Sequence, residues 1–304
     1  MRALALLALV ACTPSFDAPS DLRDLRVLAV QAEPAEAQFD ETGVDDVQVH
    51  MLVVDPARSK AFALMKWDIC APTDSRRCDG QYGPAFLSGQ ESRQGGNEFP
   101  AVTLSIPAAA VQAALESDKL RGLGGVRAQF SLSVDDGDPN GAAYASKVLL
   151  YSKRGTPPNH NPLMTGMLLT RLGDPRGTLQ PGDTLCLQPG EEVGLRPLLA
   201  ADARETYTAT DLRGNTITLT EDPQYSFFVT PGADFDRDTA IEPEDGKPPP
   251  DGLTRIEASA GSGTFFVVIR DGRGGESWLS FPWTTPEVSQ CVPASARAPR
   301  SVRR

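Results

Sequence analysis

Apolar residues in this chain fall in short runs that are bounded by turn-forming residues. Polar and apolar positions alternate from Val47 to Met51 and from Val126 to Val134, which is the period of a half-buried β-strand. Glycine (27 residues) and proline (26 residues) are plentiful, as is typical of short strands joined by turns. The first half is predicted to hold strands at 25–33, 47–54, 62–69, 102–106, 126–134 and 145–151. The second half is predicted to hold strands at 165–172, 183–188, 193–199, 205–209, 216–219, 224–230, 253–259, 264–270 and 277–284.

One segment departs from the strand pattern. Residues 107–116 begin with Pro107 and are rich in alanine, and Val111 and Leu115 lie four positions apart. Proline suits the first turn of a helix, alanine has the highest helix propensity, and residues four apart share one helix face. We therefore expect one short helix in the first half.

A proline-rich connector separates the two halves. Residues 156–162 contain three prolines, Pro157, Pro158 and Pro162, which stiffen the chain and end the strand pattern. We place the linker at 156–164, between a domain at 25–155 and a second domain at 165–293, and residues 294–304 form a basic tail.

The two halves look like variations on one unit. Residues 126–151 and 264–284 each read as a strand, a turn that contains Asp-Gly, and a returning strand, which is the pattern of a β-hairpin. Residues 49–58 correspond in the same way to residues 194–204, because each is an apolar strand that ends in an Asp and Arg turn. Repeated short strands with a closing hairpin predict β-sandwiches.

The closing hairpins resemble the last two strands of bacterial immunoglobulin-like and PKD/cadherin-like domains, in which an Asp-Gly-x-Gly-Gly turn such as Asp271–Gly275 is common. Trp67 resembles the core tryptophan of such sandwiches. Cys70 departs from the family pattern because it is too close to Trp67 to be the usual inter-sheet cysteine, and so does the predicted helix. The resemblance implies a mainly β chain with two tandem immunoglobulin-like sandwiches and one short helix in the first.

The N-terminus has the features of an export signal. Met1 and Arg2 give a short positive start, Ala3 to Val10 is apolar, and a small residue precedes Cys12. This segment resembles the lipobox of bacterial lipoproteins, and the whole arrangement is similar to myxobacterial lipoproteins with sandwich repeats. The resemblance implies a signal peptide at 1–11, a lipid on Cys12, a polar tether at 12–24 and residence at the outer membrane.

Charge and cysteine content fit an exported protein. The formal net charge of −11 argues against nucleic-acid binding. With Cys12 assigned to the lipid, four cysteines remain for disulfides in an oxidising compartment. Three pairings are possible; nearness in sequence favours Cys70–Cys78, which leaves Cys186–Cys291. The absence of a CxxC pair argues against a zinc site.

Candidate chemistry is sparse. The two histidines, His50 and His160, stand in different contexts, and no Gly-x-Ser-x-Gly, phosphate-binding loop or His-Glu-x-x-His motif occurs. Calcium is the one metal considered, because alternate oxygen side chains can converge on it. The first candidate set is Asp136, Asp138 and Asn140, where the alternative is a polar hairpin turn. The second candidate set is Asp234, Asp236 and Asp238, where the alternative is a solvated acidic loop.

Aromatic residues gather near the last strands of the second half, where they could fill the core or form a platform for sugars. These residues are Trp278, Phe281, Trp283, Tyr225, Phe227 and Phe228. Core filling is the favoured interpretation.

We interpret the chain as a non-catalytic binding or scaffold protein that is anchored to the membrane by its N-terminal lipid. Its expected partner is another envelope protein, which binds loops of the sandwiches, with the acidic, proline-rich segment 231–252 as the expected recognition surface. The alternative is a carbohydrate- or peptidoglycan-directed hydrolase of the envelope, which would need paired carboxyls in a cleft. A solute-binding lipoprotein is disfavoured because repeated helices are missing.

Overall fold

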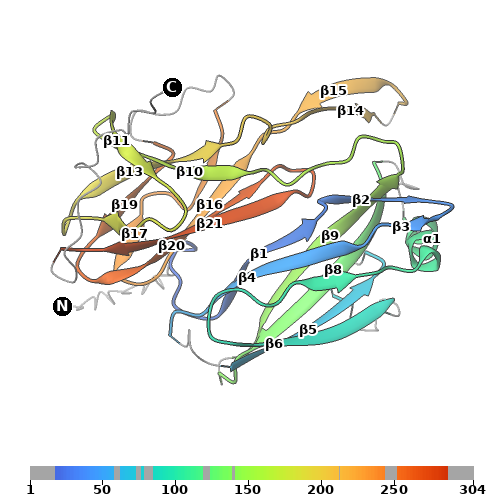
Figure 1. Ribbon diagram of the computed structural model, residues 1–304, viewed down its shortest axis with the longest axis horizontal. Coiled ribbons are helices and arrows are strands. Elements are labelled where there is room, and N and C mark those ends of the chain that lie inside the picture. Colours follow the sequence, from blue (N-terminus) through green and yellow to red (C-terminus); the bar gives the residue numbers. More distant parts are fainter. Residues whose placement is uncertain are drawn as a thin grey trace, which may run out of the picture.

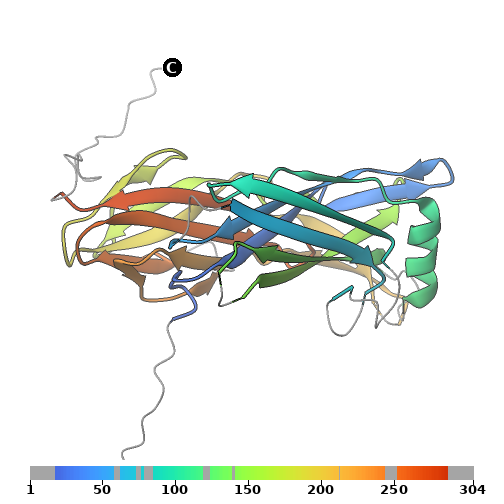
Figure 2. The same ribbon diagram turned by 90° about the horizontal axis from the view of Figure 1, so that it is seen from below.

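The computed structural model describes residues 18–57, 62–72, 77–78, 85–118, 124–138, 141–211, 213–243 and 252–286. These residues form 21 strands and one helix, arranged as two β-sandwiches in an elongated molecule (Figures 1 and 2). Among the described residues, no helix is long and apolar enough to span a bilayer. The predicted mainly β fold with a single helix is confirmed.

The first sandwich packs a three-stranded sheet on a six-stranded sheet. The smaller sheet has the strand order β1 (Arg26–Glu33), β4 (Val47–Val54), β7 (Val102–Leu104). The larger has the order β3 (Gly43–Val44), β2 (Glu36–Asp40), β9 (Ala143–Lys153), β8 (Val126–Asp135), β5 (Phe62–Cys70), β6 (Leu87–Gln94). Their inner faces bury one apolar core, in which Trp67 stacks on Phe130 with ring centroids 5.9 Å apart. Helix α1 (Ala108–Ser117) connects β7 to β8.

The second sandwich packs two five-stranded sheets, and a separate two-stranded hairpin projects from it. One sheet has the order β11 (Asp174–Leu179), β10 (Met164–Arg171), β13 (Glu192–Leu199), β19 (Thr254–Ala258), β17 (Ala233–Phe235). The other has the order β12 (Leu185–Cys186), β21 (Glu276–Thr284), β20 (Ser262–Arg270), β16 (Gln224–Val229), β18 (Thr239–Ile241). The hairpin consists of β14 (Thr206–Thr210) and β15 (Thr216–Thr220).

Both sandwiches have the same immunoglobulin-like strand pairing. In each, the last two strands form a long antiparallel hairpin, β8–β9 or β20–β21. In each, a short early strand also pairs in parallel with the last strand, β2 with β9 and β12 with β21. The equivalence extends to β4 and β13, so the correspondences seen in the sequence lie at equivalent places in the two sandwiches.

The two sandwiches share a buried apolar interface. The outer face of the β1–β4 sheet packs against the outer face of the β20–β21 sheet. The fully or nearly buried members of this cluster are Leu22, Leu28, Ala29, Leu52, Val54, Phe266 and Val268. Burial of apolar surface is the main favourable term in protein association, so this cluster stabilises one arrangement of the two sandwiches. The ion pair between Lys147 and the buried Glu276 joins them at 3.0 Å.

The last part of the predicted tether at 12–24 lies against the second sandwich. Leu22 is fully buried at the interface, and its N–H donates to the carbonyl of Val229 at 2.9 Å. The N–H of Val229 donates in turn to the carbonyl of Ser20. Residues 18–24 are thus folded against the second sandwich, because a single leucine in this polar stretch meets an uncovered part of β16.

The segment 231–252 is not one loop, as its proline and acidic content had suggested. Its first part supplies β17 and β18, and Ala233 and Phe235 pack on the second core. Residues 244–251 lie outside the described residues. The other strands missed from the sequence are β2, β3, β6 and β11, and they have few strongly apolar positions.

Candidate functional site

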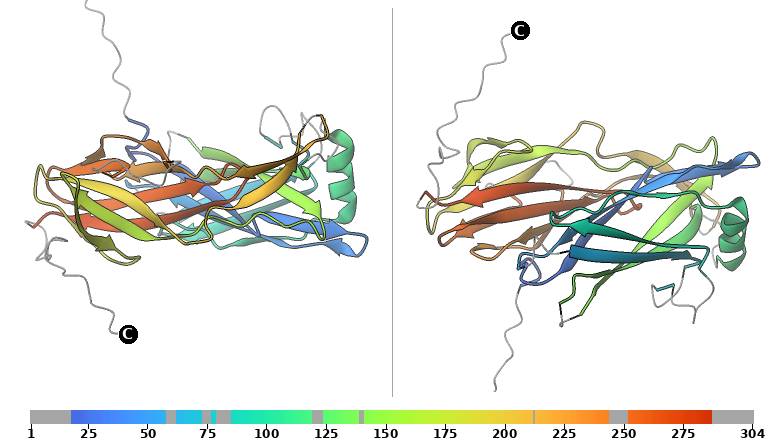
Figure 3. Two further views of the ribbon diagram at one scale, coloured as in Figure 1. Left: turned by 90° about the horizontal axis from the view of Figure 1, so that it is seen from above. Right: turned by 60° about the horizontal axis from the view of Figure 1, so that its bottom comes forward.

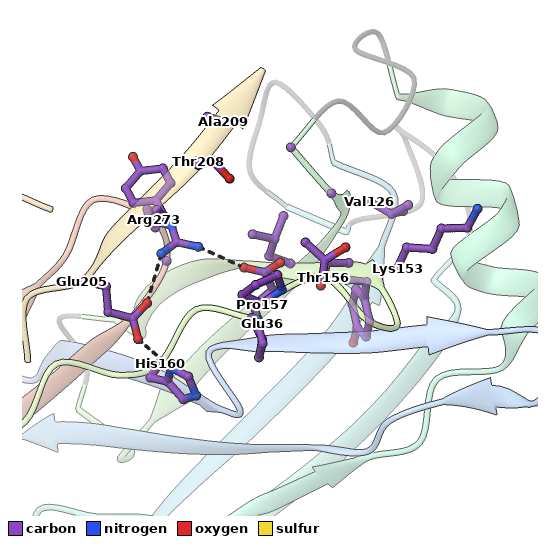
Figure 4. A pocket seen from close by; sticks show the side chains of 18 of the residues that line it. Glu36, Val126, Lys153, Thr156, Pro157, His160, Glu205, Thr208, Ala209 and Arg273 are labelled. Carbon is purple, nitrogen blue, oxygen red and sulfur yellow. Dashed lines mark hydrogen bonds and ion pairs between the residues drawn. The ribbon is translucent and has the colours of Figure 1, made fainter. Parts of the chain in front are cut away.

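A large groove lies between the β14–β15 hairpin and the first sandwich. The hairpin projects from the second sandwich beside β2 and β9 of the first (Figures 1 and 3). The groove has a volume of about 1590 Å³, and β2, β8, β9, α1, the connector at 156–160, β14 and the Gly272–Gly274 turn contribute to its lining. Figure 4 shows this site from close by.

The floor of the groove is apolar. Val148 and Leu150 of β9 form it and are at least partly exposed, and Phe39 and Leu115, which pack on the first core, line the groove as well. Val148, in the middle of the long strand β9, retains 49% of its accessible surface. The exposure arises because Val148 and Leu150 point to the outer face of the sheet, opposite to the core side chains Leu149 and Tyr151. The first sandwich therefore offers apolar surface to a ligand.

One wall of the groove is the strand β14. All five residues from Thr206 to Thr210 line the groove, whereas β15 contributes only Thr218. In the described part of the chain β14 pairs with β15 alone, so its other edge has no partner strand. Both faces of β14 contribute to the lining, which places this unpaired edge along the groove.

A cluster of charged residues closes one end of the groove, and Arg273 lies at its centre (Figure 4). The guanidinium forms ion pairs with Glu205 at 3.1 Å, with Glu221 at 3.0 Å and with Glu36 at 3.5 Å. It also stacks over the ring of Tyr207, 4.0 Å from the centroid. Glu36 belongs to the first sandwich and the other residues to the second, so Arg273 joins the two sandwiches directly.

The Asp-Gly-x-Gly-Gly turn positions Arg273. The carboxylate of Asp271 accepts hydrogen bonds from the backbone N–H groups of Arg273, Gly274 and Gly275. Gly275 is required because an added Cβ would lie 2.8 Å from the carbonyl oxygen of His160. The motif thus allows the turn to approach the connector closely.

The connector is bonded to both sandwiches. The fully buried Asn159 donates its backbone N–H to Glu36 at 3.0 Å and its side-chain amide to Asp271 at 2.7 Å. Asn161 donates to the carbonyl of Ala32 and accepts from the N–H of Glu276. These bonds fix the proline-rich connector to both sandwiches.

The carboxylates at this end of the groove are held in ion pairs with Arg273. Burial raises the pKa of Glu221, and the nearby Asp271 adds to the rise, while a backbone bond from Glu205 and the contact with Arg273 oppose it. Glu221 has only 1% of its side chain exposed and does not line the groove. His160 contacts Glu205 at the surface. Each carboxylate of the cluster is held by Arg273, so the arrangement fixes the two sandwiches relative to each other.

The calcium candidates are not brought together as ligand sets. The described residues contain no group of three or more His, Cys, Asp or Glu side chains that could hold a metal ion. Asp236 is engaged by Arg255 and Thr254: burial opposes the shift, but hydrogen bonds from the backbone N–H and side chain of Arg255 and from Thr254 lower the pKa of Asp236. Asp234, Asp236 and Asp238 do not form such a group among the described residues. Asp136 accepts the N–H of Asp138 within a polar turn, and Asn140 lies outside the described residues.

Of the cysteine predictions, the Cys70–Cys78 disulfide is present and joins the end of β5 to the following segment. Cys186 is disulfide-bonded, and its expected partner Cys291 lies outside the described residues. Cys12, the predicted lipidation site, also lies outside them. His50 lies on β4 opposite Gln31, far in the chain from His160 and on a different element.

The aromatic residues of the second sandwich mostly fill its core, as favoured from the sequence. Tyr225, Phe227, Phe281 and Trp283 are buried, and Phe265 stacks on Phe281 at 5.1 Å. The remaining two, Phe228 and Trp278, pack at the interface between the sandwiches. These rings do not form an exposed platform for sugars.

The groove itself was not predicted. The sequence analysis did predict strands at 205–209 and 216–219, and these two strands form the hairpin. Nothing in the sequence showed that this hairpin would reach the first sandwich, since that depends on the packing at the interface.

No protein-family model matches the chain, and no curated protein matches it. Solved structures align with it at low similarity. A transglutaminase from red sea bream is 9% identical over 86% of this chain and 31% of its own, with a TM-score of 0.28. Latent PorU from Porphyromonas gingivalis is 10% identical over 89% of this chain and 24% of its own, with a TM-score of 0.25. The Ig1-2 module of the Drosophila receptor tyrosine phosphatase DLAR is 9% identical over 86% of this chain and 99% of its own, also with a TM-score of 0.25. The chain thus spans at most about a third of the first two proteins, and likenesses this weak carry no functional argument.

Proposed function

We propose that this chain is an exported, lipid-anchored binding protein of the bacterial envelope, which acts without catalysis and recognises a protein partner. The observation that carries the proposal is the groove, which combines an apolar floor with an unpaired strand edge. Exposed apolar surface of this kind is typical of interaction sites. The fixed connection of the two sandwiches supports the same function, because a rigid site loses less conformational entropy on binding.

The groove replaces segment 231–252 as the proposed recognition surface. Phe235 packs on the second core, and Glu242 accepts from Tyr225 at 2.8 Å and pairs with Arg196 at 2.9 Å. A deletion of that segment would damage the sandwich and could not report on binding alone. The hydrolase alternative needs a pair of carboxyls available to a substrate, whereas Glu36 and Glu205 in the groove are engaged by Arg273.

The test is crosslinking in intact envelopes, followed by affinity purification and mass spectrometry. Val148→Arg places a charge on the groove floor, and Ile241→Arg is the matched control because Ile241 is also exposed, at 61%, and does not line the groove. We expect one abundant partner with the wild type and with Ile241→Arg, and its loss with Val148→Arg. A wild-type chain that captures no protein above background would contradict the proposal.

The location is tested separately with the Cys12→Ser variant. Since the lipid on Cys12 is the proposed anchor, this substitution should move the protein from the membrane fraction to the soluble fraction of the envelope. Cys12→Ser protein that remains in the membrane fraction would refute lipid anchoring.

A further inference from the structure

We infer that the groove binds an extended peptide segment of the partner, which adds as a third strand to the free edge of β14. The inference rests on the proposed binding function and names the form of the ligand. In this mode main-chain hydrogen bonds provide affinity, and pockets for alternate side chains provide specificity.

The register of the hairpin identifies the groups that are available on β14. Asp211 donates its N–H to Asn215, and Glu221 donates its N–H to Glu205, so these are hydrogen-bonded pairs of the antiparallel ladder. Such pairs alternate with pairs whose N–H and C=O groups point away from each other. Thr206, Thr208 and Thr210 therefore direct their backbone N–H and C=O groups away from β15, towards the groove.

The dimensions of the site favour a peptide over a small molecule. The groove volume of about 1590 Å³ exceeds the roughly 300–1,000 Å³ that is usual for small-molecule pockets. The five residues of β14 span about 16 Å at roughly 3.3 Å per residue. An added strand of five or six residues would therefore match the length of this edge.

The lining of the groove specifies the kind of peptide. The apolar floor formed by Val148 and Leu150 suits side chains at alternate positions of a strand, because these point to the same face. Lys153 lines the groove near α1, is exposed, and forms no ion pair with any described residue (Figure 4). A carboxylate would complement it, so the expected ligand alternates apolar and small polar residues and has an acidic residue at the end near α1.

The experiment tests peptide binding at the outer edge of β14 and at the outer edge of β15 separately. Thr208→Pro removes an outward N–H from β14 without removing a bond to β15, and proline is tolerated at such edge positions. Thr220→Pro removes an outward N–H from β15, together with the hydroxyl that bonds Thr206 at 3.1 Å, and the residue does not line the groove. Circular dichroism and thermal unfolding establish that both variants are folded.

The probe is selected from a random octapeptide library displayed on phage, with the full chain in detergent as the immobilised target. The most enriched peptide is then synthesised with a fluorescein label and titrated by fluorescence anisotropy. We expect selected sequences with alternating apolar residues, a loss of at least tenfold in affinity for Thr208→Pro, and less than a twofold change for Thr220→Pro. We also expect Lys153→Gln to weaken peptides with an acidic end.

Three results would overturn the inference: no enriched sequence, equal binding by both proline variants, or a loss confined to Thr220→Pro. The last result would assign binding to the edge of β15, where Ile217 and Leu219 are exposed, and would fit a second copy of the chain or another strand there. The envelope crosslinking distinguishes this failure from that of the proposed function, since a partner that Thr208→Pro still captures would uphold a binding protein without strand addition.

Discussion

Arg273 forms ion pairs with carboxylates of both sandwiches at one end of the groove. It pairs with Glu36 of the first sandwich and with Glu205 and Glu221 of the second, and only 16% of its side chain is exposed. Removal of one partner from a buried ion pair leaves uncompensated charge, which costs more than the pair itself contributes. At the scale of single residues, the fixed geometry of the groove therefore depends on this guanidinium.

We expect Arg273→Met to lower the free energy of unfolding by about 3–5 kcal/mol, because it leaves three carboxylates together without a cation. The loss should be larger at pH 8 than at pH 4, because burial raises the pKa of Glu221 and its protonation in acid removes part of the repulsion. Urea denaturation at both pH values measures it. Arg213→Met, on the exposed hairpin turn, is the control and should cost less than about 0.5 kcal/mol. A similar loss for both variants would contradict the role of the cluster.

A second residue-scale prediction concerns Asp40, at the β2–β3 turn. The hydroxyl and N–H of Thr42, followed by Arg154, lower the pKa of Asp40 to about 2. Because the folded pKa lies below the ordinary value of 3.8, the ionised carboxylate stabilises the turn above that pH, and this contribution is lost as the pH falls through about 2. NMR titration should show the midpoint rising towards 3.8 in Thr42→Ala and remaining unchanged in Thr103→Ala. An unchanged midpoint in Thr42→Ala would show that the hydroxyl is not the main cause.

At the scale of elements, the N-terminal segment acts as part of the interface. Leu22 is fully buried, whereas its neighbour Arg23 exposes 56% of its side chain. We expect Leu22→Ala to cost about 2–5 kcal/mol, as for other buried leucines, and Arg23→Ala to cost little. Hydrogen exchange gives a local readout, because the N–H of Val229 donates to Ser20. Exchange at Val229 should accelerate in Leu22→Ala, and unchanged protection there would show that the segment is not held by its leucine.

The sequence predicted most elements where apolar residues alternate, and the reasons for the failures are physical. Strand β4 was predicted with the observed bounds, and β8, β20 and β21 within one or two residues. Strand β6 was missed because Leu87–Gln94 has a single strongly apolar residue and is an edge strand. Strand β18 was missed because its three residues lie between acidic and proline-rich stretches.

The candidate site was largely beyond prediction for a related reason. The Asp271–Gly275 turn was identified as a family feature, but its contact with the connector depends on how the sandwiches pack. Glu36 and Arg273 are 237 positions apart, and only the folded interface brings them together. The apolar floor was not identified, because alternation shows which residues share a face and not which face is covered.

At the scale of the whole molecule, the two sandwiches should unfold and move as one body. Leu52 is 1% exposed and lies in the interface cluster, while its neighbours Met51 and Val53 point into the first core. A charge at Leu52 therefore opposes the association of the sandwiches without emptying either core, and the buried charge would have no partner.

We expect the wild type to unfold in a single calorimetric transition, and Leu52→Asp to unfold in two, with a larger radius of gyration by small-angle scattering. Ile241→Asp carries the same charge at an exposed position and should retain one transition and the wild-type radius. If Leu52→Asp kept the single transition and the wild-type radius, the connector and the Arg273 cluster alone would suffice to hold the sandwiches together.

Separation of the sandwiches would also widen the groove, because its floor belongs to one of them and β14 to the other. Peptide affinity should therefore fall in Leu52→Asp even though every groove residue is retained.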